Sequence, residues 1–172
     1  SPDGNHIYVA AYTDDALTVF RRDPATGRAT FLQTIKDGVS GVDGLNGAQS
    51  VVVSPDGKHV YVASYYDNAV AVFERDPIAG TVTFVERQLD GLNGVDGLNQ
   101  ALSVAISPDG AHVYAAGMGD SAVAAFARDA NTGRLTFAQV VKDGVGGVDG
   151  LNSAYSVVVS PDGAHVYATG SL

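Results

Sequence analysis

"SVVVSPDGKHVYVAS", residues Ser50–Ser64, decides the fold of this 172-residue chain. The valine-rich run Gln49–Ser54 predicts a strand that is buried on both faces. Pro-Asp-Gly then predicts a tight turn, because proline fixes φ and glycine accepts a positive φ. His59–Ser64 predicts a second strand. The stretch therefore indicates two neighbouring antiparallel strands.

The residues that follow predict two further strands joined by turns. Ala69–Arg75 predicts a third strand and Thr81–Gln88 a fourth, with turns at Tyr66–Asn68 and Asp76–Gly80. The loop Leu89–Asn99 then leads to the next valine-rich run. No segment of about ten residues shows the apolar spacing of a helix, so the sequence predicts an all-β fold.

This unit repeats without insertion or deletion. Ser-Pro-Asp-Gly begins at Ser1, Ser54, Ser107 and Ser160, so the period is 53 residues. Starting from the first of these turns, the strands group as three, four, four and two, thirteen in all. We therefore treat the chain as one domain, 1–172, built from the repeats 1–53, 54–106 and 107–159 and the partial repeat 160–172.

Four antiparallel strands in a repeat of this length are typical of a β-propeller blade. One four-stranded sheet cannot bury both of its faces, whereas stacked blades bury each other. Small residues such as Ala63, Ala69 and Ala71 would allow the close approach, and Val51–Val53 would lie near the ring axis. The predicted fold is a β-propeller of four-stranded blades, with about three blades in this chain.

Propellers close with four to eight blades, so the ring must be completed by other blades. Either those blades lie outside this sequence, which starts without methionine as a processed product or an excised fragment would, or two copies complete each other. Ser160–Leu172 repeats the role of Ser1–Thr13, so either end could complete a blade that the partner begins. We expect a homo-oligomer, with a dimer favoured.

The composition excludes several functions. A net charge of −9 without a cluster of lysine or arginine disfavours nucleic acids and anionic membranes. The absence of cysteine removes disulfides and thiolate sites. No apolar run approaches the roughly 18 residues of a membrane helix, so we expect no membrane insertion.

The loops between repeats carry the candidate metal ligands. Aspartate and asparagine oxygens beside glycine turns can bind Ca²⁺, although this spacing is not that of an EF-hand. The alternative is that these side chains accept hydrogen bonds from the loop's own amides. The sequence leaves both interpretations open for Asp37, Asp43, Asn46, Asp90, Asp96, Asn99, Asp143, Asp149 and Asn152.

Other repeated polar residues point to structural roles. Each histidine begins the second strand of a different repeat, which predicts a structural side chain bonded to a turn or to the aspartate of Ser-Pro-Asp-Gly. Arg22, Arg75 and Arg128 each precede an aspartate, which predicts a local ion pair or a turn cap. Tyrosines that vary between repeats could form a binding surface or pack half-buried: Tyr12, Tyr65, Tyr66 and Tyr155.

The motifs "SVVVSPDGKHVYVAS", "NAVAVFERD" and "VTFV" resemble the repeats of lactonase-type seven-bladed propellers, the 6-phosphogluconolactonase-like and YVTN-repeat group. The resemblance covers the whole chain and implies a propeller fold. It also implies either lactone chemistry or a non-enzymatic binding role, since the family holds both. Family enzymes place unmatched His, Glu and Arg residues in the central channel. Here every histidine belongs to the repeat, so no catalytic residue is assigned.

Three functional hypotheses follow. Catalysis needs groups in distinct environments, whereas near-identical repeats give equivalent ones. The first hypothesis is therefore a non-enzymatic propeller module, secreted, periplasmic or on the cell surface, that binds a partner or assembles with itself. The second is a fragment of a lactonase-like hydrolase whose catalytic blades lie outside this chain. The third is a Ca²⁺-stabilised adhesion repeat, and Ca²⁺ is the only cofactor considered.

Overall fold

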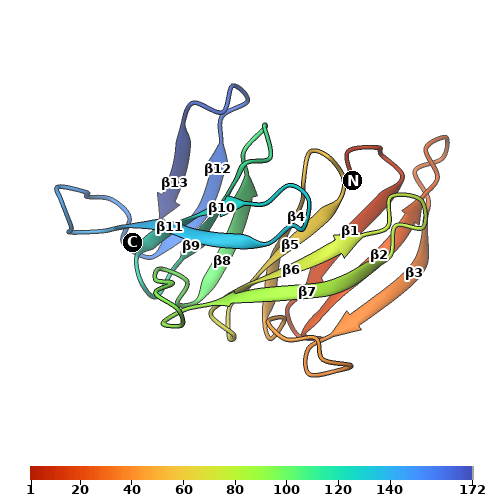
Figure 1. Cartoon of the computed structure of the whole chain (residues 1–172), viewed down its shortest axis with the longest axis horizontal. Helices are drawn as coiled ribbons and strands as arrows, with labels where there is room; N and C mark the ends of the chain where they lie inside the picture. The colour runs from red at the N-terminus through yellow and green to blue at the C-terminus, as the bar shows by residue number, and fades with distance from the viewer. Residues whose placement is uncertain (172) are drawn as a thin grey trace.

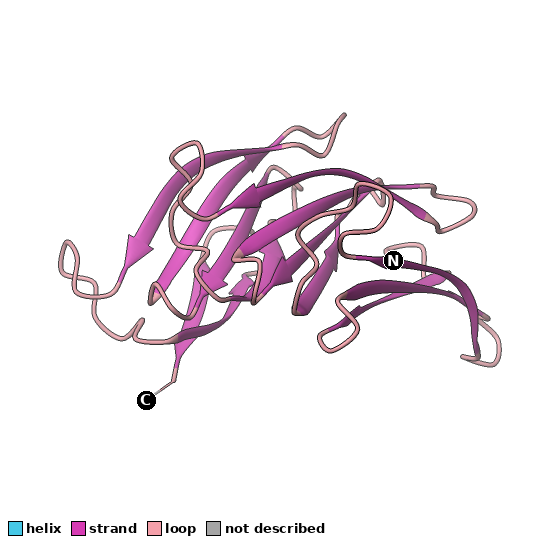
Figure 2. Cartoon of the chain, turned by 90° about the horizontal axis from the view of Figure 1, so that it is seen from below, coloured by secondary structure: helices cyan, strands magenta, loops and turns pink. Residues whose placement is uncertain are grey.

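Thirteen strands in four antiparallel sheets make up the computed structural model, which describes residues 1–171 (Figures 1 and 2). We number the sheets as blades 1 to 4. Blade 1 holds β1 (His6–Ala11), β2 (Ala16–Arg22) and β3 (Ala29–Lys36), and blade 2 holds β4 (Ala48–Val53), β5 (His59–Ser64), β6 (Ala69–Arg75) and β7 (Val82–Leu89). Blade 3 holds β8 (Ala101–Ile106), β9 (His112–Gly117), β10 (Ala122–Arg128) and β11 (Leu135–Lys142), and blade 4 holds β12 (Ala154–Val159) and β13 (Val166–Gly170).

The strand groups of three, four, four and two confirm the predicted all-β fold. Strands are hydrogen-bonded in chain order within every blade. The first strands of successive blades pack beside one another, β4 against β8 and β8 against β12, so the blades stand around a common axis as the arc of a propeller. None of the described residues is helical, and so no helix is available to span a membrane.

The core lies between the blades. Phe73 of blade 2 is fully buried with Leu17 and Val19 of blade 1 in the same cluster. Phe126 of blade 3 occupies the equivalent place against Val72 of blade 2. Each such aromatic side chain contributes about 2–3 kcal/mol when it is fully buried. Stacking of neighbouring blades, rather than any single sheet, therefore stabilises the fold.

Burial is distributed differently from the prediction for the first strand of each blade. We expected Gln49–Ser54 to be buried on both faces, but the strand runs Ala48–Val53 and Val51–Val53 are only half-buried. All six residues of the second strand, His59–Ser64, are buried. The first strand forms the edge of its sheet at the axis, so it has a hydrogen-bonded neighbour on one side only. The second and third strands are flanked on both sides and carry the core.

The Ser-Pro-Asp-Gly turn forms as predicted. In blade 2 the amide of Gly57 donates to the carbonyl of Ser54 at 2.8 Å, and Gly57 has φ +72°. The Asp56 carboxylate accepts from the amide of Lys58, and the Ser54 hydroxyl accepts from the amide of His59. The serine and aspartate side chains thus hold the turn, which explains why all four residues recur together.

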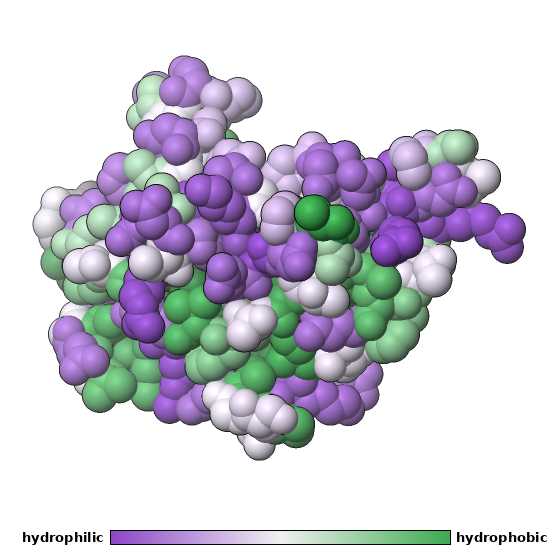
Figure 3. All heavy atoms as spheres, turned by 45° about the vertical axis from the view of Figure 1, so that its right-hand side comes forward, coloured by the Kyte–Doolittle hydropathy of each residue, from purple (hydrophilic) through white to green (hydrophobic). Residues whose placement is uncertain are grey.

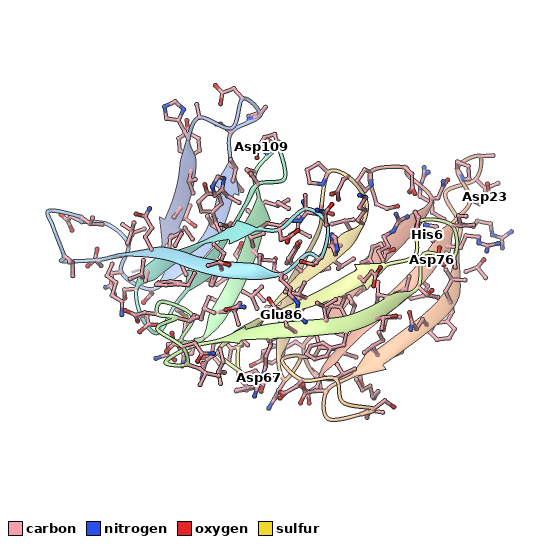
Figure 4. All side chains as sticks on the ribbon, viewed as in Figure 1. His6, Asp23, Asp67, Asp76, Glu86 and Asp109 are labelled. Carbon is pink, nitrogen blue, oxygen red and sulfur yellow. The ribbon has the colours of Figure 1, made fainter. Side chains whose placement is uncertain are left out.

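Two opposite faces of the arc carry different segments. We call one the clasp face; it holds the Ser-Pro-Asp-Gly turns and the turns between the third and fourth strands, along the upper edge of Figure 1. The other, the loop face, holds the loops between blades and the turns between the second and third strands. Backbone hydrogen bonds join these segments, as from Tyr65 N to Gly47 O and from Gly119 N to Asn99 O. In Figure 4, Asp109, His6 and Asp76 lie toward the clasp face and Asp67 lies toward the loop face.

Candidate functional site

Arg75, at the end of β6, reaches across to blade 1 on the clasp face. Its Nε donates to the hydroxyl of Tyr8 at 2.7 Å, and its Nη2 lies 2.7 Å from Asp3 Oδ2 and 3.0 Å from His6 Nδ1. Its Nη1 donates to the carbonyl of Gly57 at 2.8 Å in its own blade. We call this set of contacts a clasp. The Arg75 side chain is 1% exposed and that of Asp3 is 34% exposed, so the clasp is a partly buried ion pair in which the guanidinium is hydrogen-bonded through all three nitrogens.

The same clasp joins blades 2 and 3. Arg128 Nε donates to the hydroxyl of Tyr61 at 2.7 Å, and its Nη2 lies 2.8 Å from both Asp56 Oδ2 and His59 Nδ1. Tyr61 in turn donates to the carbonyl of Gly133 at 2.9 Å. The Ser-Pro-Asp-Gly aspartate, the histidine, the tyrosine and the arginine therefore recur because together they join one blade to the next.

A glycine completes each clasp. A Cβ placed on Gly80 would overlap the imidazole of His6, and one on Gly133 would overlap that of His59. Both glycines also have positive φ, +78° and +74°. The position therefore needs glycine for two reasons, the backbone conformation and the space that the histidine ring occupies.

These contacts correct two predictions. Arg75 and Asp76 were expected to form a local ion pair or a turn cap. Asp76 accepts from the amides of Ile78 and Ala79, which confirms the turn cap, while Arg75 forms its ion pair with Asp3 and not with Asp76. The histidine ring was expected to bond to a turn or to the aspartate of Ser-Pro-Asp-Gly, but the His6 ring nitrogen contacts the arginine of the next blade. The structural role predicted for both residue types is confirmed, and the partners were wrong.

The clasp shifts the acidities of its members. Burial alone would raise the pKa of Asp56, but hydrogen bonds from Ser54 and Arg128 outweigh it and lower the pKa to about 2. Burial, with the Arg128 charge beside it, lowers the pKa of the His59 imidazole. Burial raises the pKa of Tyr61 to about 12. His59 is therefore held neutral between fixed partners and is not placed to bind a substrate.

The clasp is incomplete at both ends of the described arc. Arg22 of blade 1 is half-buried, and its Nη1 donates only to the carbonyl of Gly4, at 3.1 Å. At the other end His112 is exposed and Tyr114 is half-buried. Arg22 thus presents the arginine half of a clasp, and Asp109, His112 and Tyr114 present the acceptor half.

A polar bridge also joins the outermost strands. Glu86 of β7, labelled in Figure 4, accepts from the amide of Leu135 at 2.9 Å and pairs with Arg134 at 2.6 Å. Gln33 of β3 contacts both the amide and the carbonyl of Val82 in blade 2. These contacts fix the spacing of the blades at their outer rim.

A groove of about 620 Å³ lies between β3 and β7 near this rim. Its lining includes Ile35, Val42, Val82 and Phe84 and the single ionisable side chain Lys36. Figure 3 shows apolar side chains gathered on this side of the molecule below a polar upper rim. Without a second ionisable group the groove offers no acid–base pair for hydrolysis.

The loop face holds the predicted aspartate loops. Asp37 Oδ1 accepts from the amide of Leu45 at 2.9 Å, Asp90 does the same from Leu98, and Asp143 from Leu151. Each of these aspartates closes its own loop across eight residues. The predicted hydrogen bonding to loop amides is therefore present in all three loops.

Two clusters of three carboxylates form within the described residues. Asp37 and Asp43 meet Asp67, with ligand atoms within 4.8 Å of one another, and Asp90 and Asp96 likewise meet Asp120. The sequence analysis missed Asp67 and Asp120, which lie in the turns after β5 and β9. Their recurrence as the only invariant residue of that turn was the available signal.

The asparagines of these loops do not belong to the carboxylate clusters. The backbone amide of Asn46 donates to Asp67 at 2.9 Å, and that of Asn99 donates to Asp120 at 3.0 Å. In the third loop the Asn152 Oδ1 lies 3.5 Å from the Ser121 hydroxyl, and Asp149 belongs to neither carboxylate cluster. The clusters therefore consist of carboxylates, and the predicted asparagines support them through the backbone.

Each cluster already contains a positive charge from the protein. Arg87 Nη1 lies 2.9 Å from Asp43, and Lys142 Nζ lies 2.7 Å from Asp96 and 3.7 Å from Asp120. Burial raises the pKa of Asp67 even so, with the charges of Asp37 and Asp43 adding to the effect. Carboxylate oxygens suit Ca²⁺, but each basic side chain competes for the same oxygens. Calcium binding stays a prediction.

A tyrosine cluster lies next to the first of these clusters. Tyr12 comes from the turn after β1, and Tyr65 and Tyr66 come from the turn after β5. The ring centroids of Tyr12 and Tyr66 are 5.4 Å apart, those of Tyr65 and Tyr66 are 5.1 Å apart, and those of Tyr12 and Tyr65 are 6.2 Å apart. Tyr66 remains 57% exposed. The three rings thus form one aromatic surface across blades 1 and 2, while Tyr155 lies apart on β12.

The sequence of this chain is similar to that of a known protein family and of one curated relative. The family model described as "Lactonase, 7-bladed beta-propeller" matches residues 1–139. An uncharacterized protein of Staphylococcus epidermidis is 27% identical over 129 residues, which cover 72% of this chain and 37% of that protein. The chain therefore spans well under half the length of the curated relatives that it matches.

Two solved structures are also similar to this chain over most of its length. A protein of Bacteroides fragilis assigned as a 6-phosphogluconolactonase is 29% identical with a TM-score of 0.66, over 81% of this chain and 36% of that one. The periplasmic gluconolactonase of Pseudomonas aeruginosa is 25% identical with a TM-score of 0.72, over 98% of this chain and 40% of that one.

Proposed function

Because this chain belongs to the lactonase family of seven-bladed β-propellers, we propose that it supplies blades of a sugar-lactone hydrolase. The observation that carries the proposal is the match of the family model over residues 1–139, supported by similarity to two structures named for gluconolactone chemistry. The whole propeller's activity is part of the proposal, since this chain covers only part of those proteins.

The comparisons favour the second of the three sequence hypotheses over the first. Repeat symmetry pointed to a non-enzymatic module, because equivalent repeats give equivalent environments. The structure shows that much of this symmetry resides in the clasps and the core, which hold the blades together, while the aromatic residues of the loop face differ between repeats. Symmetry in the scaffold leaves the function of the loop face open, so it no longer counts against an enzyme.

The reaction sets requirements for the site. Water adds to the lactone carbonyl, the ring carbon–oxygen bond breaks, and a hydroxy acid leaves with release of a proton. A general base and a group that stabilises the carbonyl oxygen are needed. The buried His6 and His59 are committed to clasps. We therefore propose that this chain contributes scaffold and loop-face contacts, with the catalytic groups supplied by the blades that complete the ring.

Location and assembly belong to the same proposal. Similarity to a periplasmic gluconolactonase supports an exported protein. The unpaired clasp halves at Arg22 and at Asp109, His112 and Tyr114 support completion of the ring by further blades of the same repeat, either from the same polypeptide or from a second copy.

The direct test is hydrolysis of glucono-1,5-lactone followed by pH-stat titration of the acid released. The assay should use a propeller whose ring is complete, either an oligomer of this chain or a longer polypeptide that carries the further blades, with the heat-denatured protein as control. We expect acid release faster than the spontaneous reaction and saturating in lactone. A rate equal to the control across several sugar lactones would contradict the proposal.

A further inference from the structure

The tyrosine cluster is built by two coincident departures from the repeat. Tyr66 corresponds to Gly119 in blade 3, and Gly47 corresponds to Gln100 in the next loop. A Cβ on Gly47 would lie 2.9 Å from Tyr66 Cδ2 and 3.1 Å from its backbone nitrogen. The glycine therefore leaves room for the tyrosine ring, and blade 3 has neither residue.

Backbone conformation does not explain this glycine. Gly47 has φ +71°, but Gln100 and Ser153 adopt positive φ of 55° and 51° at the equivalent positions. Residues with side chains therefore tolerate this loop conformation here. The space for Tyr66 is what requires Gly47, which indicates that the aromatic surface is a specific arrangement of this blade pair.

The size of the surface limits its ligand. Tyr66 is more than half exposed, and Tyr12 and Tyr65 are half-buried. Three tyrosines present an area suited to one small ring, whereas a stable protein interface buries about 800 Å² on each partner. Tyrosine offers an apolar face and a polar hydroxyl on a rigid side chain, which suits a ligand with both characters.

The ring geometry argues against a cage for a quaternary ammonium ion. Centroid separations of 5.1–6.2 Å are those of rings in direct contact. No space is left between the rings for a cation to enter. A ligand can therefore only lie on the outer face of the cluster, with the face of a ring stacked on Tyr66.

Charge around the cluster selects among ring ligands. Asp15 Oδ1 accepts from the amide of Gly47 at 2.8 Å, and Asp67 follows Tyr66 directly. The nearby basic side chain Arg87 is already paired with Asp43. With a chain charge of −9, this surface repels a phosphate group, while its carboxylates can accept hydrogen bonds from hydroxyl groups.

We infer that Tyr12, Tyr65 and Tyr66 form a binding subsite for an uncharged sugar ring, and that the subsite disfavours phosphorylated sugars. This rests on the proposed function for the choice of a sugar, and it deepens that function by naming neutral rather than phosphorylated lactones as the substrate class. The apolar face of the sugar stacks on Tyr66, and its hydroxyls face the carboxylates of Asp15 and Asp67.

Stable sugars test this inference without turnover. The chain contains no tryptophan, so tyrosine fluorescence can be followed directly, and its loss of response in Tyr66→Ala separates the cluster from the five other tyrosines. We expect D-glucose to change this fluorescence in a saturable manner that is insensitive to salt. Glucose 6-phosphate should bind at least tenfold more weakly at low ionic strength, with the difference shrinking as salt is added.

Three variants localise the effect. Tyr66→Ala should weaken glucose binding about tenfold, whereas Tyr66→Phe should retain it. Tyr155→Ala is the matched control, since Tyr155 is 59% exposed outside the cluster, and it should leave binding unchanged. Gly47→Ala should weaken binding with every tyrosine still present. Thermal melts confirm that each variant is folded.

Several results would overturn the inference. These are equal binding of glucose and glucose 6-phosphate, unchanged binding in Tyr66→Ala, no saturable binding of glucose, or tighter binding of tetramethylammonium than of glucose. The outcome separates from that of the proposed function. If the protein hydrolyses lactones and Tyr66→Ala binds glucose as the original protein does, only the subsite is contradicted. If the protein binds glucose but hydrolyses no lactone, only the proposed hydrolase function is contradicted.

Discussion

The Arg75 guanidinium and the Tyr8 hydroxyl are 67 residues apart in sequence and are joined by a hydrogen bond of 2.7 Å in the structure. Arg128 and Tyr61 repeat this relationship one blade later at the same separation and distance. The bond crosses from one blade to the next, so it measures whether the blades are stacked. Losing this hydrogen bond should therefore destabilise the whole arc of stacked blades.

Replacing Arg128 with methionine should destabilise the protein by about 3 kcal/mol, because it leaves the Tyr61 hydroxyl and the Asp56 carboxylate without their partner. Urea denaturation measures the change. Arg22→Met is the matched control when both variants are measured at a concentration where the protein is monomeric, since Arg22 then makes one hydrogen bond at the open end, and it should cost less than 1 kcal/mol. Equal losses in the two variants would show that the clasp adds no stability.

A pair of glycine substitutions separates backbone strain from steric overlap. Gly27 and Gly133 have nearly the same φ, +72° and +74°, but a Cβ on Gly27 meets nothing within 4 Å while one on Gly133 overlaps His59. Gly27→Ala should cost roughly 1 kcal/mol for the positive φ. Gly133→Ala should cost about 1–3 kcal/mol more because it displaces the imidazole. Thermal denaturation of both variants gives the difference directly.

Lowering the pH should remove the stability that the clasp contributes. Asp56 has a pKa of about 2 in the folded chain against about 3.9 when unfolded, so the stability it adds is complete above pH 4 and is lost as the pH falls toward 2. His59, whose pKa burial lowers, acts in the same direction because it must be charged next to Arg128. Asp56→Asn should flatten the decline between pH 4 and 2 in urea midpoints. Asp109→Asn, which alters an equivalent turn without an arginine contact, should flatten it less.

Calcium titration decides between the two interpretations of the aspartate loops. Binding at the two carboxylate clusters predicts that millimolar Ca²⁺ raises the melting temperature and that EDTA reverses the rise. It also predicts tighter binding in Arg87→Gln, which removes the competing cation from Asp43. The hydrogen-bond interpretation predicts no change in either protein. Equilibrium dialysis provides the independent measure.

The molar mass in solution tests assembly. If two copies complete one ring, light scattering should give twice the 17.6 kDa of the chain, and Arg22→Met should shift the particle toward the monomer, because Arg22 would then face the acceptor half of the partner's clasp. A monodisperse folded monomer that the variant leaves unchanged would argue against the dimer.

Local pattern was sufficient to predict the strands. The period of 53 residues, the valine-rich runs and the Pro-Asp-Gly turns placed thirteen strands in the right groups, because turn chemistry and alternation act between near neighbours. Burial of Val51–Val53 was overestimated, because an apolar run does not reveal that its strand lies at the edge of the sheet.

Contacts between blades could not be read from the same pattern. The pairing of Arg75 with Asp3 spans 72 residues, and its sequence neighbour Asp76 offered a plausible but wrong partner. Asp67 was missed because a single aspartate in a turn is ordinary until a loop from another repeat meets it. Recurrence at a fixed period marks such residues as structural, but only the stacking of blades reveals their partners.

Each clasp joins any repeat to its successor through the same four side-chain types and records nothing about position along the chain. Duplicating or deleting a whole 53-residue unit would therefore leave the residues of every clasp matched. The number of units is therefore limited by the curvature of the closed ring rather than by the chemistry of the clasps.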